Sequence, residues 1–392
     1  MASSNSRSRR HGVLVVATSD YSLDLHMRGM LRDLARHGMG PVHIAAADSG
    51  RLTRVATREG VPAHPIPMRR DMSPWHDLVA LIRLIGLYLH VRPALTIYGT
   101  PKAALLGAIA AWLTRVPARV QILHGLRLET VQGISRRILL ATEWLALTLS
   151  TSTLAVSASL RQRCIELGLN GQRMRVLGPG GFVGMDLDRH RLAGGDTARI
   201  QALRTEMGAT PDVPLIGFAG RVTRDKGIIE LIDAVAALRA TGSPIEVALV
   251  GEDEGINELP ARTRTLLAQP WAHLVGAVPD ATGHIAAFDV LCLPSYREGL
   301  PTVILEAMAS GVPVIGSTAT GVVDLVKDGD TGLLVPTRDA AALSNAIALM
   351  LDNDALRLRL TTRAQDYVTA FAEAPMWRRH RSHYEALLRL TT

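Results

Sequence analysis

The sequence is poor in cysteine and in aromatic residues. Its two cysteines, Cys164 and Cys292, lie far apart, each inside an apolar segment. This excludes a disulfide framework and a cysteine-based zinc site, so we expect the protein in the reducing cytoplasm. Aromatic residues make up only 4% of the chain and do not interleave with basic residues, which argues against nucleic acid as a partner.

Long apolar runs are also missing. The longest candidate, residues 78–91, contains Arg83 and is shorter than the roughly 20 apolar residues that a membrane-spanning helix needs. The basic residues 7–10 are followed by a short apolar run, residues 13–17, and then by polar residues. We therefore expect neither a spanning helix nor a signal peptide.

Several nucleotide and metal motifs are absent. The sequence has no G-x-G-x-x-G turn and no GxxxxGK[ST] loop, which argues against a nicotinamide enzyme, a flavin enzyme or a P-loop enzyme. It also has no Asp-x-Asp between a strand and a loop that would hold a metal. We expect no bound cofactor and no bound metal.

The length and the order of patterns predict two α/β domains. At 392 residues the chain exceeds one ordinary core. Short apolar runs alternate with helical patterns, and this predicts doubly wound sheets with sites at the carboxyl ends of their strands. The alternation restarts after residues 178–196, a Gly-rich and then polar stretch that we predict to be the hinge between the domains. The predicted domains are residues 1–185 and 186–375. Residues 376–392 form a helix that is expected to pack back on the first domain.

Charge is distributed unevenly along the chain. Residues 1–190 hold 24 Lys and Arg against 12 Asp and Glu, whereas residues 191–392 hold 19 against 24. A basic first half favours an anionic partner such as a membrane surface or a phosphorylated lipid. The chain would then lie peripherally on the inner face of the plasma membrane. The alternative is a solvated basic surface without a partner.

One strand-to-helix loop carries two cations. Residues 218–227 read FAGRVTRDKG and place Arg221 and Lys226 between two glycines, Gly220 and Gly227. Close backbone approach and flexible cations suit a diphosphate. Only three of the 43 basic residues are lysine, so Lys226 stands out. The alternative is an ordinary loop with exposed cations.

A second constellation follows a later strand. Glu298 lies in the loop after that strand, and Glu306 lies within the next helix. The helix start would offer backbone N–H groups to a phosphate, because the first turn lacks intrahelical acceptors. These groups belong to Gly299, Leu300, Thr302 and Val303. The two carboxylates could bind hydroxyls of a ribose and a sugar, or could be a capping residue and a surface residue.

These segments resemble a known family. Glu298 and Glu306 form an E-x7-E pair, and EGLPTVILEAMASGVPVIG, GRVTRDKG and TGLLVP are similar to the retaining GT-B glycosyltransferases of family 4. The resemblance covers nearly the whole chain and is strongest over residues 214–340. It implies two Rossmann-like domains facing each other across a cleft, with a nucleotide diphosphate sugar as co-substrate and no metal.

The resemblance also implies roles for single residues. Glu298 and His124 act in catalysis, with Glu298 and Gly299 at the donor sugar and Glu306 at the ribose. Arg221, Lys226 and Gly220 bind the diphosphate together with the helix start. His124, in ILHGLRLET, lies beside the donor sugar. A lone histidine of this kind can instead be a buried structural residue.

Two stretches of the first half resemble one branch of the family. HGLRLETVQG and TPKAALLGA are similar to members that extend lipid-carrier-linked sugars in capsule, exopolysaccharide or protein-glycan assembly. Members of that branch tend to carry histidine where this chain has Gly99. The expected acceptor-side residues are Ser19, Asp20, Thr100, Lys102 and Arg127. Asp20 has an equally good interpretation as a helix cap.

The predicted function is therefore retaining transfer from a nucleotide diphosphate sugar, with a UDP-sugar favoured, to a lipid-linked saccharide. We expect front-face transfer, in which the leaving phosphate takes the acceptor proton, because no second carboxylate stands beside Glu298 in the sequence. A small soluble acceptor such as an antibiotic aglycone or aminocyclitol would also fit these motifs. A nucleotide-sugar epimerase of the same fold would fit these motifs as well. A non-catalytic partner subunit is the third competing function.

Overall fold

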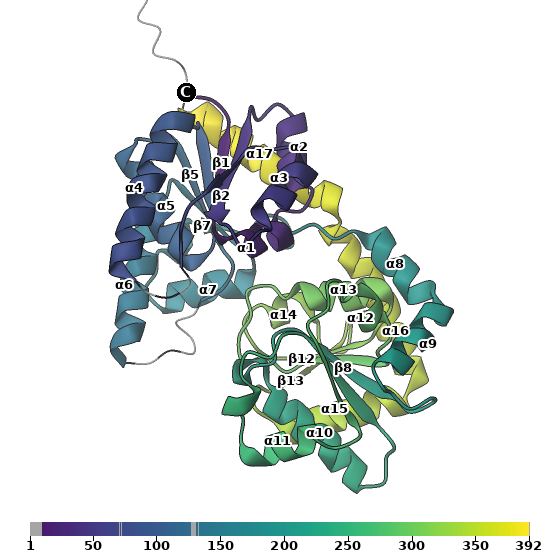
Figure 1. Ribbon diagram of the computed structural model, residues 1–392. Coiled ribbons are helices and arrows are strands. Elements are labelled where there is room, and N and C mark those ends of the chain that lie inside the picture. Colours follow the sequence, from purple (N-terminus) through teal and green to yellow (C-terminus); the bar gives the residue numbers. More distant parts are fainter. Residues whose placement is uncertain (1–9, 70, 72, 127–130, 132, 392) are drawn as a thin grey trace, which may run out of the picture. The chain divides into compact units, whose positions relative to one another are not determined.

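The chain folds into two compact units (Figure 1). The computed structural model describes residues 10–391, except 70, 72, 127–130 and 132. The first unit comprises residues 1–183 and 374–392, and the second comprises residues 184–373. The last helix, α17 (Glu373–Thr391), thus belongs almost entirely to the first unit, where Arg381 pairs with Asp33.

The first unit is built on a parallel sheet of seven strands in the order β3-β2-β1-β4-β5-β6-β7. Its central strand β1 is apolar and buried over residues 13–17, as expected of a parallel strand covered on both faces. Val15 is in register with Ile44 on one side and Ile97 on the other. The strands are β1 (Val13–Ser19), β2 (Val42–Ala47), β3 (Ala63–Pro65), β4 (Leu95–Tyr98), β5 (Ala118–Leu123), β6 (Ser152–Ala155) and β7 (Met174–Arg175).

Helices cover this sheet, with α4, α5 and α6 lying side by side (Figure 1). Beneath them Leu84, Tyr88 and Tyr98 are fully buried, and the Tyr88 hydroxyl lies 2.7 Å from Thr96 Oγ1. The helices are α1 (Asp20–His26), α2 (Met30–Arg36), α3 (Leu52–Glu59), α4 (Pro74–Val91), α5 (Pro101–Leu113), α6 (Gly133–Leu149) and α7 (Ala158–Glu166), with the 3-10 turn η2 (Gly171–Arg173).

The second unit repeats the plan with six parallel strands in the order β10-β9-β8-β11-β12-β13. The strands are β8 (Leu215–Ala219), β9 (Glu246–Val250), β10 (Ala272–Gly276), β11 (Val290–Leu293), β12 (Val314–Ser317) and β13 (Leu333–Val335). The helices are α8 (Leu187–Gly195), α9 (Thr197–Glu206), α10 (Ile228–Ala240), α11 (Ala261–Leu267), α12 (Thr282–Ala286), α13 (Thr302–Ser310), α14 (Val322–Leu325), α15 (Ala340–Asp352) and α16 (Asp354–Val368). The 3-10 turns are η3 (Arg224–Lys226), η4 (Ile256–Glu258) and η5 (Thr369–Phe371).

The expected doubly wound α/β class is confirmed, but the predicted hinge over residues 178–196 is wrong in its second half. Residues 187–195 form α8, because Asp186 caps the helix by accepting from Arg189 N at 3.1 Å. Asp196 caps α9 in the same way. The polar residues in the second half of this stretch therefore cap the two helices or lie on their exposed sides.

Both sheets reverse their strand order at one point. In the first unit the reversal lies between β1 and β4, and in the second it lies between β8 and β11. Parallel sheets bind ligands at the carboxyl ends of the strands beside such a reversal, where the loops on either side diverge. The loops after these four strands are therefore where a site is expected in each unit.

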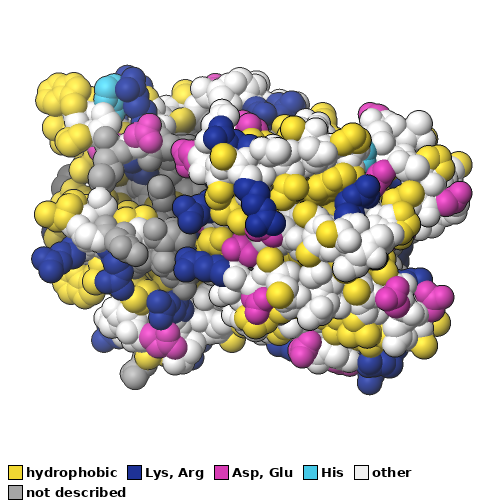
Figure 2. All heavy atoms as spheres, turned by 90° about the horizontal axis from the view of Figure 1, so that it is seen from below, with side chains coloured by type: hydrophobic (Ala, Val, Ile, Leu, Met, Phe, Trp, Pro, Cys, Tyr) yellow, Lys and Arg dark blue, Asp and Glu magenta, His cyan; other side chains and the backbone are white. Residues whose placement is uncertain are grey.

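The surface is mixed in character. Figure 2 shows one face of the molecule, on which hydrophobic, basic and acidic side chains are interspersed. Within the residues that the structure describes, no helix combines the length and the apolar character required to cross a bilayer.

Candidate active site

In the second unit, glycines bring the loops after β8, β9 and β11 close together. A Cβ on Gly227 would lie 2.1 Å from the carbonyl oxygen of Pro294, and a Cβ on Gly251 would lie 1.8 Å from that of Gly220. Gly227 also has φ 74°, which disfavours any residue with a side chain. These positions require glycine, and the close packing brings the cationic loop against the loop that carries Glu298.

Lys226 and Glu298 meet at this junction. Lys226 Nζ donates a hydrogen bond to Glu298 Oε1 at 2.6 Å, and their side chains are only 17% and 12% exposed. The backbone of the Glu298 loop is tied down as well, since Glu298 N donates to the Thr320 carbonyl at 3.0 Å. The structure thus brings together a cation and a carboxylate that the sequence singled out in separate motifs.

Arg221 is the more accessible cation of the pair predicted to bind diphosphate. Its side chain is 52% exposed and forms an ion pair with Glu254, which follows β9. Burial lowers the pKa of Arg221, but the hydrogen bond and charge of Glu254 outweigh this and raise it above its ordinary value. Arg221 therefore keeps its positive charge and is half exposed at the end of β8.

Neighbouring side chains hold the Glu298 loop in place, and sequence reasoning did not identify them. Arg297 pairs with Asp225 at 3.0 Å, and the Tyr296 hydroxyl donates to Glu230 Oε1 at 2.9 Å. The Arg338 guanidinium lies over the Tyr296 ring at 4.6 Å from its centre. In the sequence, the only indication of a role for Tyr296 and Arg297 was their position directly before Glu298. Their partners are distant in sequence, so the contacts could not be predicted from it.

The helix after this loop starts as predicted. Pro301 is the N-cap residue of α13, and the amides of Thr302 and Val303 lie in its first turn, which lacks intrahelical acceptors. Leu300 and Gly299 lie just before that start. The arrangement suits a phosphate, since the positive end of the helix dipole is at this terminus.

Glu306 lies in the middle of α13. Burial raises the pKa of its carboxyl to about 7. Arg189 and Thr302 oppose the rise, whereas the charge of Asp280 adds to it. A carboxyl with such a pKa can either accept or donate a hydrogen bond near neutral pH, which suits contact with a hydroxyl.

In the first unit a pocket opens at the carboxyl ends of β1, β4 and β5. His124 directly follows β5, and Thr100 precedes α5. Both line the pocket, as do Ser22, His26 and Phe182. Of the predicted first-unit residues the structure thus brings His124 and Thr100 together at one pocket, and it adds three that the sequence did not suggest.

His124 is fixed by its neighbours. Its ring stacks on His26 with centroids 4.9 Å apart, and Phe182 lies edge-on at 5.4 Å. Burial lowers the pKa of His124 to about 3 and that of His26 to about 4, so both rings are neutral at pH 7. A neutral imidazole offers one N–H donor and one acceptor. A Cβ on Gly99 would lie 2.7 Å from His124 Nε2, so the ring fills the space above that glycine.

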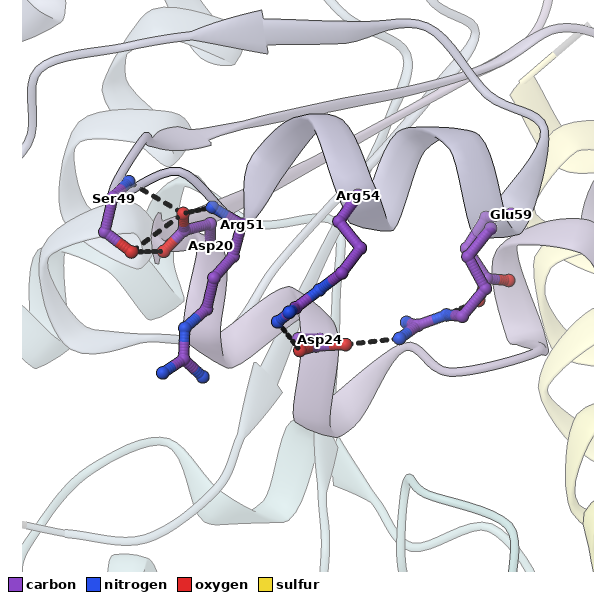
Figure 3. Close-up of polar contacts among 7 residues, drawn as sticks. Asp20, Asp24, Ser49, Arg51, Arg54 and Glu59 are labelled. Carbon is purple, nitrogen blue, oxygen red and sulfur yellow. Dashed lines mark hydrogen bonds and ion pairs between the residues drawn. The ribbon is translucent and has the colours of Figure 1, made fainter. Parts of the chain in front are cut away.

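Asp20 is engaged in holding the neighbouring loop (Figure 3). It is 1% exposed, and its carboxylate accepts from Ser49 N at 2.7 Å and from Arg51 N at 3.0 Å. Ser49 Oγ donates to both carboxylate oxygens. Burial raises the pKa of Asp20, but these hydrogen bonds outweigh it and hold the pKa below its usual value. Asp20 therefore holds the residues that precede α3, although the N-cap residues are Ser19 for α1 and Arg51 for α3, and its acceptor-side role stays a prediction.

The other predicted acceptor-side residues differ in their surroundings. Lys102 Nζ pairs with Asp77 Oδ1 at 2.7 Å and also donates to the Asp71 carbonyl, so its charge is directed toward α4. Ser19 ends β1, and its hydroxyl lies 3.2 Å from Ser22 Oγ, which lines the pocket. Arg127 lies outside the described residues.

Over the described part of the chain, no group of three or more His, Cys, Asp or Glu side chains is arranged to hold a metal ion. Metal independence stays a prediction. The carboxylates nearest the cations are each paired within the protein, as Asp225 and Glu254 are.

Comparison with known proteins gives a consistent family. A family model described as "Glycosyl transferases group 1" matches residues 200–367, and one described as "Glycosyl transferase 4-like domain" matches residues 24–180. The capsular polysaccharide biosynthesis glycosyltransferase CapM of Staphylococcus aureus is 31% identical over 366 residues, covering 93% of this chain and 94% of that protein. A D-inositol 3-phosphate glycosyltransferase of Nocardia farcinica is 31% identical over 293 residues, covering 67% of this chain and 60% of that protein.

Solved structures agree on the fold. Alr3699/HepE from Anabaena, crystallised with UDP-glucose, superposes with a TM-score of 0.78 at 19% identity, over 96% of this chain and all of that one. WaaG, a glycosyltransferase involved in lipopolysaccharide biosynthesis, superposes with a TM-score of 0.71 at 16% identity, over 95% of this chain and 99% of that one. These structures confirm the predicted GT-B fold. The family models and CapM confirm the family resemblance.

Proposed function

Because this chain belongs to the group 1 glycosyl transferases and has the GT-B fold, we propose that it transfers a sugar from a nucleotide diphosphate sugar with retention of configuration. The observation that carries the proposal is the Lys226–Glu298 pair, 2.6 Å apart, at the carboxyl ends of β8 and β11. A cation for the leaving diphosphate and a carboxylate for the sugar lie side by side at the point where a doubly wound sheet binds its ligand.

The second unit supplies the donor contacts. Lys226 and Arg221 neutralise the diphosphate, together with the amides at the start of α13. Glu298 accepts hydrogen bonds from sugar hydroxyls, and Glu306 holds the ribose. Because these groups are fixed before the reaction, they stabilise the charge that develops on the leaving phosphate without reorganising.

The reaction follows a front-face course. The bond between the anomeric carbon and the phosphate oxygen breaks, the acceptor oxygen bonds to the anomeric carbon on the same face, and the acceptor proton passes to the departing phosphate. No metal takes part. Asp225 and Glu254 are paired with Arg297 and Arg221, which supports a route without a second carboxylate as nucleophile. His124, held neutral, is proposed to donate a hydrogen bond to the transferred sugar.

The acceptor is proposed to be a lipid-linked saccharide, and the donor a UDP-sugar. CapM acts in capsular polysaccharide biosynthesis by its name, and it matches nearly the whole chain. The GT-B protein HepE was crystallised with UDP-glucose, which makes UDP-sugars the first donors to test. Such an enzyme would work in the cytoplasm at the inner face of the plasma membrane.

Product analysis tests the function. Thermal-shift screening against UDP-, GDP-, ADP- and TDP-sugars identifies the donor, since a ligand at one hundred times its Kd stabilises the folded state by about 2.7 kcal/mol. NMR of the product formed from an α-linked donor should then show an α linkage. A β-linked product would refute retention, and a trapped glycosyl-enzyme would refute the front-face route.

Two controls separate the competing functions. Incubation with the nucleotide sugar and no acceptor should leave the sugar unchanged, whereas an epimerase would convert it. Parallel assays with a lipid-linked saccharide and with water-soluble acceptors decide the acceptor class. A strong preference for a soluble aglycone would contradict the proposed lipid-linked acceptor.

A further inference from the structure

The outer surface of the helix layer α4–α5–α6 exposes large hydrophobic side chains. We call this surface the α4–α6 face. More than half of the exposed large hydrophobic side chains among the described residues lie on these three helices. They are Trp75, Leu78, Ile82, Leu89, Trp112, Leu113, Ile134, Ile138 and Trp144.

Helix α4 is apolar on two opposite sides. Ala80, Leu84 and Tyr88 are fully buried against the sheet. Trp75, Ile82 and Leu89, spaced by seven residues and therefore nearly two turns apart, are 72%, 60% and 58% exposed. A helix covering a sheet ordinarily places polar residues on this outer side. The outer stripe of α4 is not covered by any described residue, so burial in the core does not explain why it is apolar.

Helices α5 and α6, which pack in the same layer, also expose large hydrophobic side chains. Trp112 at the end of α5 is 52% exposed, and on α6 Ile134 and Trp144 are 75% and 55% exposed. Three of the five tryptophans of the chain thus point outward from one layer. Tryptophan is favoured where an apolar phase meets water, because its ring is apolar and its N–H can still reach a polar partner.

The unpaired charge of the layer has a single sign. Its arginines Arg83, Arg136 and Arg137 are exposed and form no ion pair with a described residue. Its only two carboxylates are engaged: Asp77 pairs with Lys102, and Glu143 accepts a hydrogen bond from Gln121 at 2.6 Å. An apolar surface bordered by such arginines, with both carboxylates of the described layer engaged, is complementary to an anionic interface.

We propose that the α4–α6 face docks on the surface of an anionic lipid bilayer. Trp75, Ile82 and Leu89 enter the boundary between headgroups and acyl chains, and the arginines contact anionic headgroups. The proposal extends the proposed lipid-linked acceptor by placing the first unit on the membrane that would carry it. It differs from the proposed function in that docking requires neither donor nor acceptor.

Flotation of the full chain with vesicles tests docking directly. Phosphatidylcholine vesicles with phosphatidylglycerol should bind the protein at low salt, and vesicles without phosphatidylglycerol should bind it far less. The double variant Ile82→Gln with Leu89→Gln should partition at least about tenfold less. The matched control is Leu192→Gln with Leu358→Gln, which changes two side chains that are 74% and 70% exposed in the second unit, and it should bind as the wild type does.

A charge variant tests the contribution of the arginines to docking. Arg136→Glu with Arg137→Glu should abolish the preference for anionic vesicles, whereas Arg191→Glu with Arg199→Glu, exposed positions of the second unit, should retain it. Thermal unfolding confirms that each variant is folded. Transfer to a water-soluble acceptor should continue at the wild-type rate in the face variants, which separates docking from catalysis.

Several outcomes would overturn docking. These are no binding of the wild type at low salt, equal binding by the α4 variant, or equal loss in the matched control. A wild-type dimer that the α4 variant converts to a monomer in sedimentation would show that a second copy covers the face instead. If the wild type docks but transfers nothing to a lipid-linked saccharide, docking stands and the proposed acceptor fails.

Discussion

Lys226 Nζ lies 2.6 Å from Glu298 Oε1, and this contact joins two loops whose residues are 72 positions apart. The side chains are mostly buried, so each charge depends on the other. Removing one partner of such a pair leaves the other charge desolvated and unpaired. The cation proposed for the diphosphate therefore also orients the carboxylate proposed for the sugar.

Neutralising Lys226 should impair the reaction strongly. We expect Lys226→Met to lower kcat/KM by about two orders of magnitude or more, and Arg221→Ala to do the same, because charge-assisted bonds to phosphate contribute about 1.5–3 kcal/mol and tighten in the transition state. Lys327→Met, at an exposed lysine of the same unit, is the matched control. Near-normal turnover at subsaturating donor in both site variants would refute the diphosphate assignment.

The two glutamates should separate kinetically. Glu298→Gln is expected to lower kcat more than it raises KM, because contacts to the sugar matter most when the ring flattens in the transition state. Glu306→Ala should act chiefly on the KM of the donor. Steady-state kinetics with varied donor measure both effects, with Glu258→Gln at an exposed position as control. If Glu298→Gln acted chiefly on KM and Glu306→Ala chiefly on kcat, the roles proposed for the two glutamates would have to be exchanged.

The raised pKa of Glu306 should make stability depend on pH. Its folded-state pKa of about 7 lies above the ordinary value of 4.5 because the carboxyl is buried. Between these values the folded protein binds a proton that the unfolded chain releases, so the free energy of unfolding falls as pH rises from about 4.5 to about 7. Glu306→Gln removes the titrating carboxyl and therefore this loss of stability with rising pH.

Denaturant unfolding at pH 5 and pH 8 measures the difference. Relative to wild type, Glu306→Gln should gain up to roughly 3 kcal/mol more at pH 8 than at pH 5. Leu358→Gln introduces no titrating group and should shift stability equally at both values. An equal effect of Glu306→Gln at the two pH values would contradict the buried, proton-binding carboxyl.

Gly99 should control the position of His124. The change Gly99→Ala would place a Cβ 2.7 Å from His124 Nε2, so the ring must move. We expect kcat/KM to fall by about one order of magnitude, since positioning a catalytic group within a fraction of an ångström matters for rate. Gly86→Ala, on α4 with open space around it, is the matched control and should preserve activity. Unchanged kinetics in Gly99→Ala would argue against a role for His124 at the substrate.

The sequence by itself determined the fold class and marked the motifs that are proposed to bind the donor. The apolar runs at residues 13–17 and 215–219 are typical of buried parallel strands, because they are short and period-two alternation is missing from both. Gly220, Gly227 and the start of α13 were recognisable because close approach and free helix-end amides leave a local signature. Family likeness followed from these same residues.

Only the tertiary structure decided which side chains have partners. Asp20 and Lys102 lie at the starts of α1 and α5, where a site was expected, yet Ser49, Arg51 and Asp77 engage them, and these partners come from other elements. His26 gave no local signal, and it stacks on His124 only because α1 and the end of β5 meet at the same pocket. The exposed apolar stripe of α4 could likewise be recognised only from the structure, because it lies opposite the side of the helix that fills the core. Local pattern fixes secondary structure and glycine positions, whereas hydrogen-bond partners and exposed faces depend on which distant segments the sheet order brings together.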